Sequence, residues 1–282
     1  MKTLRLVLGD QLSRDLPSLT DLDPVKDLVL MAEVMSEVTY VKHHKRKIAY
    51  LFSAMRHFAK SLGDDGIAVR YRRLDDPDNA GSLAGEVANA IATFGPDRIV
   101  ITAPGEYRLA DEMAGWQARF GLAVDIRADT RFLCSLDDFA EWAEGRKSLR
   151  MEFFYRDLRR RYQVLMEGDE PIGGKWNYDA DNRQPPKAGL AVPLPSSFAP
   201  DAITTEVLAL VDMRCADHFG QLAGFDFAVT RDQALHVLDQ FIAERLPLFG
   251  TYQDAMIEGE PWMYPRPIGL SLNAGFLLPI EV

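Results

Sequence analysis

The sequence has few cysteines, no long apolar run and no excess of basic charge. Only Cys134 and Cys215 occur among its 282 residues, and they lie far apart along the chain. Two such residues cannot build a disulfide framework or a metal centre held by cysteines. The net charge of −10 at pH 7 excludes a chain that is basic throughout, as many nucleic-acid binders are. Any basic surface must therefore be local.

No apolar run approaches the roughly 20 residues that a helix needs to cross a bilayer. The first ten residues lead directly into a strand pattern rather than into the apolar region of a signal peptide. We therefore expect a cytoplasmic protein with no membrane partner. With 47% hydrophobic and 26% charged residues, the composition is that of a chain that folds around a packed core.

Several motifs that would reveal an activity are also missing. No Gly-x-Gly-x-x-Gly run follows the first expected strand, and no P-loop motif occurs. No nucleophile stands beside a base in a recognisable pattern, so we assign no catalytic residue. The adjacent His43 and His44 do not indicate a metal site, because neighbouring side chains diverge and no further ligand stands at a suitable spacing.

Strand-like and helical segments alternate over residues 1–130. Helices are expected near 82–94 and 107–119, and the apolar residues from Ile48 to Ala59 recur at a spacing of three and four, which is typical of one helix face. This alternation predicts an α/β domain with a Rossmann-like, doubly wound parallel sheet. The expected strands are residues 3–8, 28–33, 67–71, 98–102 and 122–126.

The pattern changes after Thr130. Helices are predicted at 135–144 and 149–166, and the stretch between Gly168 and Asp201 contains six prolines and four glycines, as a long linker does. Thr230 and Gln233 form a capping-box signature that opens a further amphipathic helix. We therefore predict an α/β domain at 1–130, a helical and Pro/Gly-rich linker at 131–229, and the beginning of an all-helical domain at 230–282.

Ligands of doubly wound sheets bind beyond the carboxyl ends of the strands. The loops after the first, second and fourth expected strands are rich in acceptor groups, which suit hydroxyls and ring N–H groups better than phosphates. Helix capping or exposure to solvent is an alternative role for the same side chains. The candidate residues are Asp10, Gln11, Glu33, Glu37, Tyr40 and Glu106.

Two stretches are locally basic. Val41–Lys60 carries six Lys or Arg residues and no acidic residue, which suits either an anionic ligand or DNA phosphates, or a solvated helix face. Arg146–Arg161 combines arginines with aromatic residues. This combination could line a nucleic-acid surface, although the aromatic residues also have the spacing of a helix that packs in a core.

Beyond these patterns, long runs of the sequence resemble the prokaryotic photolyase-related proteins, which are the iron–sulfur bacterial cryptochromes and six-four photolyases. The resemblance covers essentially the whole chain. It rests on Leu-Gly-Asp-Gln-Leu at 8–12, Ala-Glu-Val-Met at 32–35, Tyr-Val at 40–41, His-His-Lys at 43–45, Lys-Ile-Ala at 47–49, Phe-Ser-Ala-Met-Arg-His-Phe at 52–58, Gly-Arg-Lys-Ser-Leu at 145–149, Met-Glu-Phe-Phe-Tyr-Arg at 151–156, Gly-Gly-Lys-Trp-Asn-Tyr-Asp at 173–179, Asn-Arg at 182–183 and Gln-Asp-Ala-Met at 253–256.

The resemblance implies an N-terminal α/β antenna domain, an interdomain linker and an all-helical FAD domain. The antenna chromophore of the family is 6,7-dimethyl-8-ribityllumazine, held at the carboxyl ends of the sheet. Glu37 is expected to hydrogen-bond this ligand, and Ile48 and Leu51 to press against its ring, although core packing is an alternative role for these two. By match to the family, the expected pocket residues are Gly9, Asp10, Glu33, Glu37, Tyr40, Ile48 and Leu51.

The family repairs DNA as a light-driven carbon–carbon lyase. Photoexcited reduced FAD donates an electron to a six-four lesion flipped out of the duplex, so damaged DNA is the expected partner of the complete flavoprotein. This sequence ends at Val282, where the helical domain of the family has scarcely begun. We therefore expect most of the FAD pocket and the four cysteines of the 4Fe-4S cluster to have no counterpart here.

A second departure lies at residues 265–269, which read Pro-Arg-Pro-Ile-Gly where the family has a serine-containing segment. Proline lacks a backbone N–H and Gly269 lacks a hydroxyl, so no flavin phosphate contact is expected there.

Two functions remain open from the sequence. The chain is either the antenna half of a photolyase or cryptochrome, binding the lumazine but not FAD, or a stand-alone small-ligand or protein-interaction module. An apolar stripe with Leu235, Leu238 and Phe241 is expected to be exposed, which would favour self-association.

Overall fold

The structure is a computed structural model that describes residues 1–187, 189–264 and 268–282. Its contacts divide the chain into two compact units, each built from separated segments. Unit 1 comprises Met1–Arg131, Ser197–Leu235 and Gly269–Leu278, and unit 2 comprises Phe132–Ser196, His236–Ile268 and Pro279–Val282. The functional division expected from the sequence, with limits at residues 130 and 229, stays a prediction.

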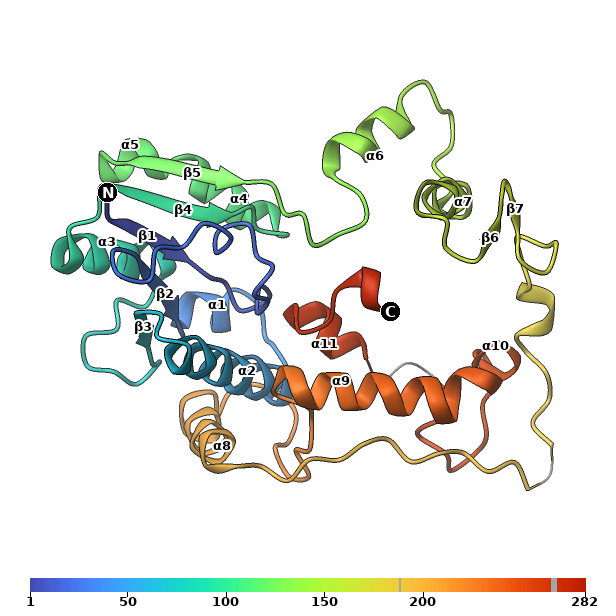
Figure 1. Cartoon of the computed structure of the whole chain (residues 1–282). Coiled ribbons are helices and arrows are strands. Elements are labelled where there is room, and N and C mark those ends of the chain that lie inside the picture. The colour runs from blue at the N-terminus through green and yellow to red at the C-terminus, as the bar shows by residue number, and fades with distance from the viewer. Residues whose placement is uncertain (188, 265–267) are drawn as a thin grey trace. The chain divides into compact units, whose positions relative to one another are not determined.

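Unit 1 contains a five-stranded sheet in the order β3-β2-β1-β4-β5 (Figure 1). Every neighbouring pair of strands is parallel, which confirms the α/β, Rossmann-like prediction. Each expected strand is present, with ends shifted by up to two residues. The strands are β1 (Thr3–Leu6), β2 (Leu28–Ala32), β3 (Val69–Arg72), β4 (Arg98–Thr102) and β5 (Ala123–Arg127).

The three central strands are buried, as strands covered on both faces must be. Leu4, Leu6, Ile99 and Ile101 are fully inaccessible to solvent and belong to one apolar cluster. This cluster also includes Val87 and other residues of α3. The helices of unit 1 are α1 (Met35–Thr39), α2 (Lys45–Asp64), α3 (Leu83–Phe94), α4 (Tyr107–Ala114), α5 (Trp116–Phe120), α8 (Ala202–Arg214), the first half of α9 (Arg231–Gln240) and α11 (Gly269–Ala274).

The helix expected at 107–119 is two helices, because α4 ends at Ala114 and α5 begins at Trp116, with Gly115 between them. The N–H of Gly115 donates to the carbonyl of Glu112 at 3.2 Å, which tightens the last turn of α4. The capping signature at the start of α9 is present in a modified form, because the Gln233 side chain bonds to the backbone of Val229 rather than of Thr230. Thr230 Oγ1 accepts from the N–H of Gln233, and the Gln233 side chain accepts from the N–H of Val229.

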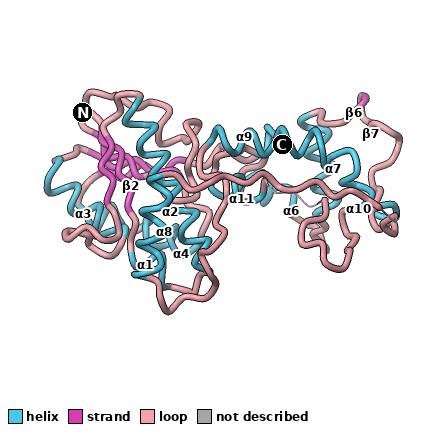
Figure 2. Tube along the Cα trace, turned by 90° about the horizontal axis from the view of Figure 1, so that it is seen from below, coloured by secondary structure: helices cyan, strands magenta, loops and turns pink. Residues whose placement is uncertain are grey.

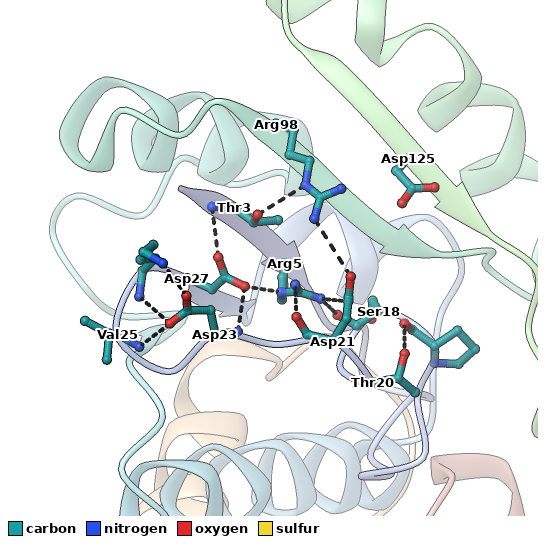
Figure 3. A network of polar contacts seen from close by, with 12 residues as sticks. Thr3, Arg5, Ser18, Thr20, Asp21, Asp23, Val25, Asp27, Arg98 and Asp125 are labelled. Carbon is teal, nitrogen blue, oxygen red and sulfur yellow. Dashed lines mark hydrogen bonds and ion pairs between the residues drawn. The ribbon is translucent and has the colours of Figure 1, made fainter. Parts of the chain in front are cut away.

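The connection from β1 to β2 is a loop anchored by a buried arginine (Figure 3). Arg5 points from the middle of β1 and is 1% exposed. Its Nε donates to the Asp27 carboxylate at 2.8 Å, and its Nη1 donates to the Ser18 carbonyl and to the Asp21 carboxylate, both at 2.6 Å. One guanidinium therefore holds both the middle and the end of this loop against the sheet.

The same loop is also tied to β4. The Gln11 side chain is fully buried and donates to the Thr102 carbonyl at 3.2 Å, while the N–H of Ser18 donates to Thr102 Oγ1 at 3.0 Å. These bonds satisfy backbone groups that would otherwise be buried without partners. The loop thus leaves the sheet along a fixed path past residues 8–12.

Unit 2 is made of helices and loops apart from two very short strands, whereas the long strands gather in unit 1 (Figure 2). Helix α7 ends four residues before the limit of 166 expected from the sequence. Over the described part of 172–200, the only regular element is a single 3-10 turn. The elements of unit 2 are α6 (Leu136–Ala143), α7 (Met151–Tyr162), β6 (Met166–Glu167), β7 (Glu170–Pro171), η1 (Asp179–Asp181), the end of α9, the π-helical turn η2 (Phe241–Arg245), α10 (Leu246–Tyr252) and η3 (Pro279–Glu281).

The apolar stripe expected to be exposed on α9 is largely covered. Leu238 and Phe241 are 6% and 5% exposed, so the expectation of an open patch at these residues is wrong. The chain's own residues bury these two side chains, whereas Leu235 is half-buried. Self-association of the chain stays a prediction. No helix in the described ranges is long and apolar enough to span a bilayer.

Replacing Arg5 by methionine should destabilise the protein strongly. The substitution keeps the apolar stem but leaves the Asp27 carboxylate, whose side chain is 3% exposed, without its cation. Removing one partner of a buried ion pair costs about 3–5 kcal/mol of unfolding free energy. Urea unfolding followed by circular dichroism measures this loss. The matched control is Lys26→Met, which breaks the exposed pair with Asp23 and should leave the midpoint nearly unchanged. Equal midpoints for the two variants would contradict the role given to Arg5.

Candidate functional site

A cavity of about 470 Å³ lies beyond the carboxyl ends of β1, β2 and β4. This is the place where parallel sheets of this kind bind ligands. All of its walls belong to unit 1. The lining residues are Val7, Leu8, Gly9, Asp10, Ala32, Val34, Glu37, Val38, Tyr40, His43, Lys47, Ile48, Leu51, Phe52, Met55, Leu83, Pro104, Gly105, Glu106, Leu109 and Asn273.

One wall of the cavity is apolar and comes mainly from α2. Ile48, Leu51, Phe52 and Met55 follow one another at helical spacing and line the cavity together. Gly9 faces this wall from the end of β1, because a Cβ atom at Gly9 would lie 3.2 Å from the sulfur of Met55. The wall therefore offers a smooth apolar surface to a flat ligand.

The lining also contains two carboxylates, those of Glu37 and Glu106, that are both bound by Arg108. The guanidinium donates to both oxygens of Glu37, at 3.1 and 2.6 Å, and to both oxygens of Glu106, at 2.9 and 3.2 Å. These two carboxylates raise the pKa of Arg108 above its usual value. The same guanidinium lies 4.4 Å from the centre of the Tyr40 ring. Arg108 thus fixes three lining side chains at once.

His43 and Lys47 form a second polar group of the lining. The two nitrogens, His43 Nδ1 and Lys47 Nζ, are 3.4 Å apart, and the His43 ring meets the Tyr40 ring edge-on at 5.0 Å. Loss of solvent is the main cause that lowers the pKa of His43 below 6.5, and the charge of Lys47 is the second cause. Its neutral form is therefore favoured near pH 7.

Asp10 lines the cavity at the end of β1. Loss of solvent raises the pKa of its carboxyl group, and the nearby charges of Asp129 and Glu106 raise it further, against the effect of Arg131. Arg131 also donates to the Asp10 backbone carbonyl at 3.1 Å while it pairs with Asp129 at 2.7 Å. Arg131 thus fixes the backbone of Asp10, a residue that lines the cavity.

Glu33 does not line the cavity, although the sequence suggests it as a pocket residue. Its side chain is fully buried and accepts two hydrogen bonds from Arg56, at 2.6 and 3.0 Å, and one from the Tyr71 hydroxyl at 2.7 Å. The backbone N–H of Leu74 donates to it as well, at 2.9 Å. Burial and the negative charge of Glu33 raise the pKa of Tyr71. In the structure, Glu33 holds α2 and β3 beside the cavity.

The structure brings together the other six suggested pocket residues, which are Gly9, Asp10, Glu37, Tyr40, Ile48 and Leu51. Their binding of a ligand stays a prediction. Gln11 does not line the cavity either, because its side chain is buried and bonds to the backbone of β4. Sequence reasoning did not suggest Asn273 for this cavity, because it lies on α11, far along the chain from the other lining residues.

No cluster of three potential metal ligands occurs among the described residues. In the second basic stretch, Arg156, Arg159 and Arg160 surround the Trp176 ring at 5.5, 5.3 and 4.6 Å. Among its aromatic residues, Phe154 is buried, whereas Phe153 is exposed. Residues 265–267, where the sequence predicts the absence of a flavin phosphate contact, lie outside the described residues.

The pKa of His43 should rise when Lys47 is replaced by methionine, because one of the two main causes of its lowering is removed. Titration of the imidazole by NMR measures this change. Since the folded state favours the neutral ring, His43 should also lower the stability as the pH falls below 6.5. Lys60→Met, an exposed change on the same helix, is the control, and an equal titration curve in both variants would contradict the assignment.

Comparisons with known proteins identify the family of this chain. The family model described as "Deoxyribodipyrimidine photo-lyase-related protein" matches residues 5–227. The chain is 49% identical over all of its 282 residues to a (6-4) photolyase of Agrobacterium fabrum, and it spans 56% of that protein's length. It is 26% identical over 149 residues, 51% of this chain and 74% of the relative, to an uncharacterized protein of Acanthamoeba polyphaga mimivirus. The chain therefore belongs to the deoxyribodipyrimidine photo-lyase-related proteins.

Proposed function

We propose that this chain is the chromophore-binding part of a light-driven (6-4) photolyase or cryptochrome of the iron–sulfur type, and that its cavity holds 6,7-dimethyl-8-ribityllumazine as an antenna. Family membership and the 49% identity to a (6-4) photolyase support the general activity. The observation that carries the ligand assignment is the cavity at the carboxyl ends of the sheet, with one apolar wall and one wall rich in acceptors.

The lining fits such a ligand chemically. A flat bicyclic ring can pack against Ile48 and Leu51, as the apolar face of a cofactor site requires. A ribityl chain presents hydroxyl donors, and the carboxylates of Asp10, Glu37 and Glu106 are acceptors. The cavity volume of about 470 Å³ falls within the range of about 300–1,000 Å³ that is usual for small-molecule sites.

The chain's own residues would bind, orient and shield the chromophore. Arg108 holds the Glu37 carboxylate in one orientation, and α2 excludes water from one face of the ligand. When bound, the chromophore would absorb light and pass its excitation to a flavin. Rigid placement favours this transfer because its rate depends on the orientation of the donor.

FAD and a 4Fe-4S cluster are not assigned to this chain. A cluster held by four cysteines needs more than Cys134 and Cys215, both of which are free. Lesion repair on damaged DNA is proposed for a protein that also contains a complete helical FAD domain. This chain spans only 56% of the (6-4) photolyase that it matches.

The lumazine should stay with the purified chain through desalting, and FAD should not, as absorption and fluorescence spectra will show. Leu51→Trp, which fills the cavity from its apolar wall, should weaken lumazine binding by at least about tenfold, equivalent to 1.4 kcal/mol. Lys60→Trp introduces the same side chain on the same helix outside the cavity and should bind as the parent does.

Two results would overturn the proposal. A folded parent chain that retains no lumazine would favour the interaction-module alternative. Retention of FAD with equal binding by both tryptophan variants would show that the cavity is not the chromophore site.

A further inference from the structure

The cavity is completed by a segment that comes more than two hundred residues after most of its lining. Residues 269–278 include α11 and belong to unit 1. Asn273, near the end of α11, is exposed and lines the cavity. Its carboxamide makes no hydrogen bond to any described residue, so both of its hydrogen-bonding groups are available to a ligand.

The position of this segment is fixed by contacts with the rest of the cavity walls. The Ala274 carbonyl accepts from the N–H of Leu12 at 2.8 Å, and Leu12 lies two residues after the cavity residue Asp10. The Leu270 carbonyl accepts from the Tyr50 hydroxyl of α2 at 2.9 Å, between residues 220 positions apart along the chain. Asn273 thus lies between two residues, Leu270 and Ala274, whose carbonyl groups are fixed by hydrogen bonds.

Gly275 allows the close approach at the end of α11. It has a φ of +84°, and a Cβ atom there would lie 3.0 Å from the Leu12 nitrogen and 3.2 Å from the Asp10 carbonyl oxygen. Only glycine combines this conformation with such a short approach at low cost. The residues on either side, Ala274 and Phe276, are buried. The segment is therefore a packed part of the wall.

The chemistry of Asn273 complements that of the other polar lining groups. Asp10, Glu37 and Glu106 are acceptors, whereas a carboxamide offers a donor and an acceptor side by side. A heterocycle with adjacent carbonyl and N–H groups presents the matching edge. The lumazine ring has this edge at its N3 position, and so do other pteridine and flavin rings.

The geometry points to Asn273 as a recognition residue that pairs with the carbonyl and N–H edge of the bound heterocycle, with Tyr50 and Gly275 as the residues that position it. This inference rests on the proposed chromophore function of the same cavity. It assigns ring recognition to α11 and leaves the ribityl chain to the carboxylates of Asp10, Glu37 and Glu106.

The test compares lumazine binding by the full chain and its variants, with fluorescence titration as the measurement. Asn273→Leu, of similar size, should weaken binding by about tenfold, because a hydrogen-bonding partner of the buried ring edge is lost. Asn273→Asp removes the donor and should also weaken it. The charge-matched control is Asn177→Asp, an exposed change in unit 2 that should leave the affinity unchanged.

A ligand analogue separates recognition from a merely structural effect. Methylation at N3 removes the donor of the ring edge, so the parent chain should bind the methylated lumazine about tenfold more weakly than the lumazine itself. Asn273→Leu should bind both ligands equally, because the group that distinguishes them is gone. A variant that discriminates as the parent does would overturn the inference.

Tyr50→Phe tests the positioning role. It removes the hydroxyl that holds the Leu270 carbonyl, without changing a lining side chain, and should weaken lumazine binding severalfold while reducing the discrimination against the methylated ligand. Unchanged discrimination would refute the role of Tyr50. If the parent chain binds no lumazine, the proposed function itself fails. If the parent binds it and Asn273→Leu binds within about twofold of the parent, only this inference fails.

Discussion

The buried ion pair between Arg5 and Asp27 is the constraint on which the first part of the fold depends. A guanidinium that is 1% exposed is tolerated only when its charge and its donors are satisfied. Asp27, Asp21 and the Ser18 carbonyl meet this requirement, and all three lie in the loop between β1 and β2. A loop in this position would otherwise be free to vary. The charge fixes its path, and the path carries Gly9 and Asp10 to the cavity.

The cavity is the indirect result of this loop and of a second buried ion pair. In many parallel units the first strand is followed by a helix. Here the fixed loop follows β1 instead and leaves space at the end of this strand, and α2 closes that space from one side. The bond between Glu33 and Arg56 holds α2 at its place beside β3. The two buried pairs therefore position opposite walls, and neither pair needs to touch a ligand to affect its binding.

The alternation of strands and helices predicted the sheet, and the rule for its carboxyl ends predicted the place of the cavity and its acceptor residues Asp10, Glu37 and Tyr40. The sequence could not show that Glu33 lies outside the cavity, because a loop carboxylate has the same sequence pattern whether it faces solvent or a buried arginine. Its partners, Arg56 and Tyr71, lie on other elements. The break at Gly115 depends on the last turn of α4 rather than on apolar spacing. Asn273 was beyond reach because only the tertiary contacts of α11 with Leu12 and Tyr50 bring it to the cavity.

The clamp of Arg108 explains how an acidic cavity can be prepared for a neutral ligand. Each oxygen of Glu37 already accepts from the guanidinium, yet a carboxylate oxygen has a further lone pair for a ligand hydroxyl. Binding therefore need not break the clamp, and the conformational entropy of these side chains is lost during folding rather than during binding. A phosphate in the same place would meet the carboxylates of Asp10, Glu37 and Glu106, whereas the lining contains one lysine, Lys47. The arrangement thus fits the proposed chromophore, whose ribityl chain carries hydroxyls and no phosphate.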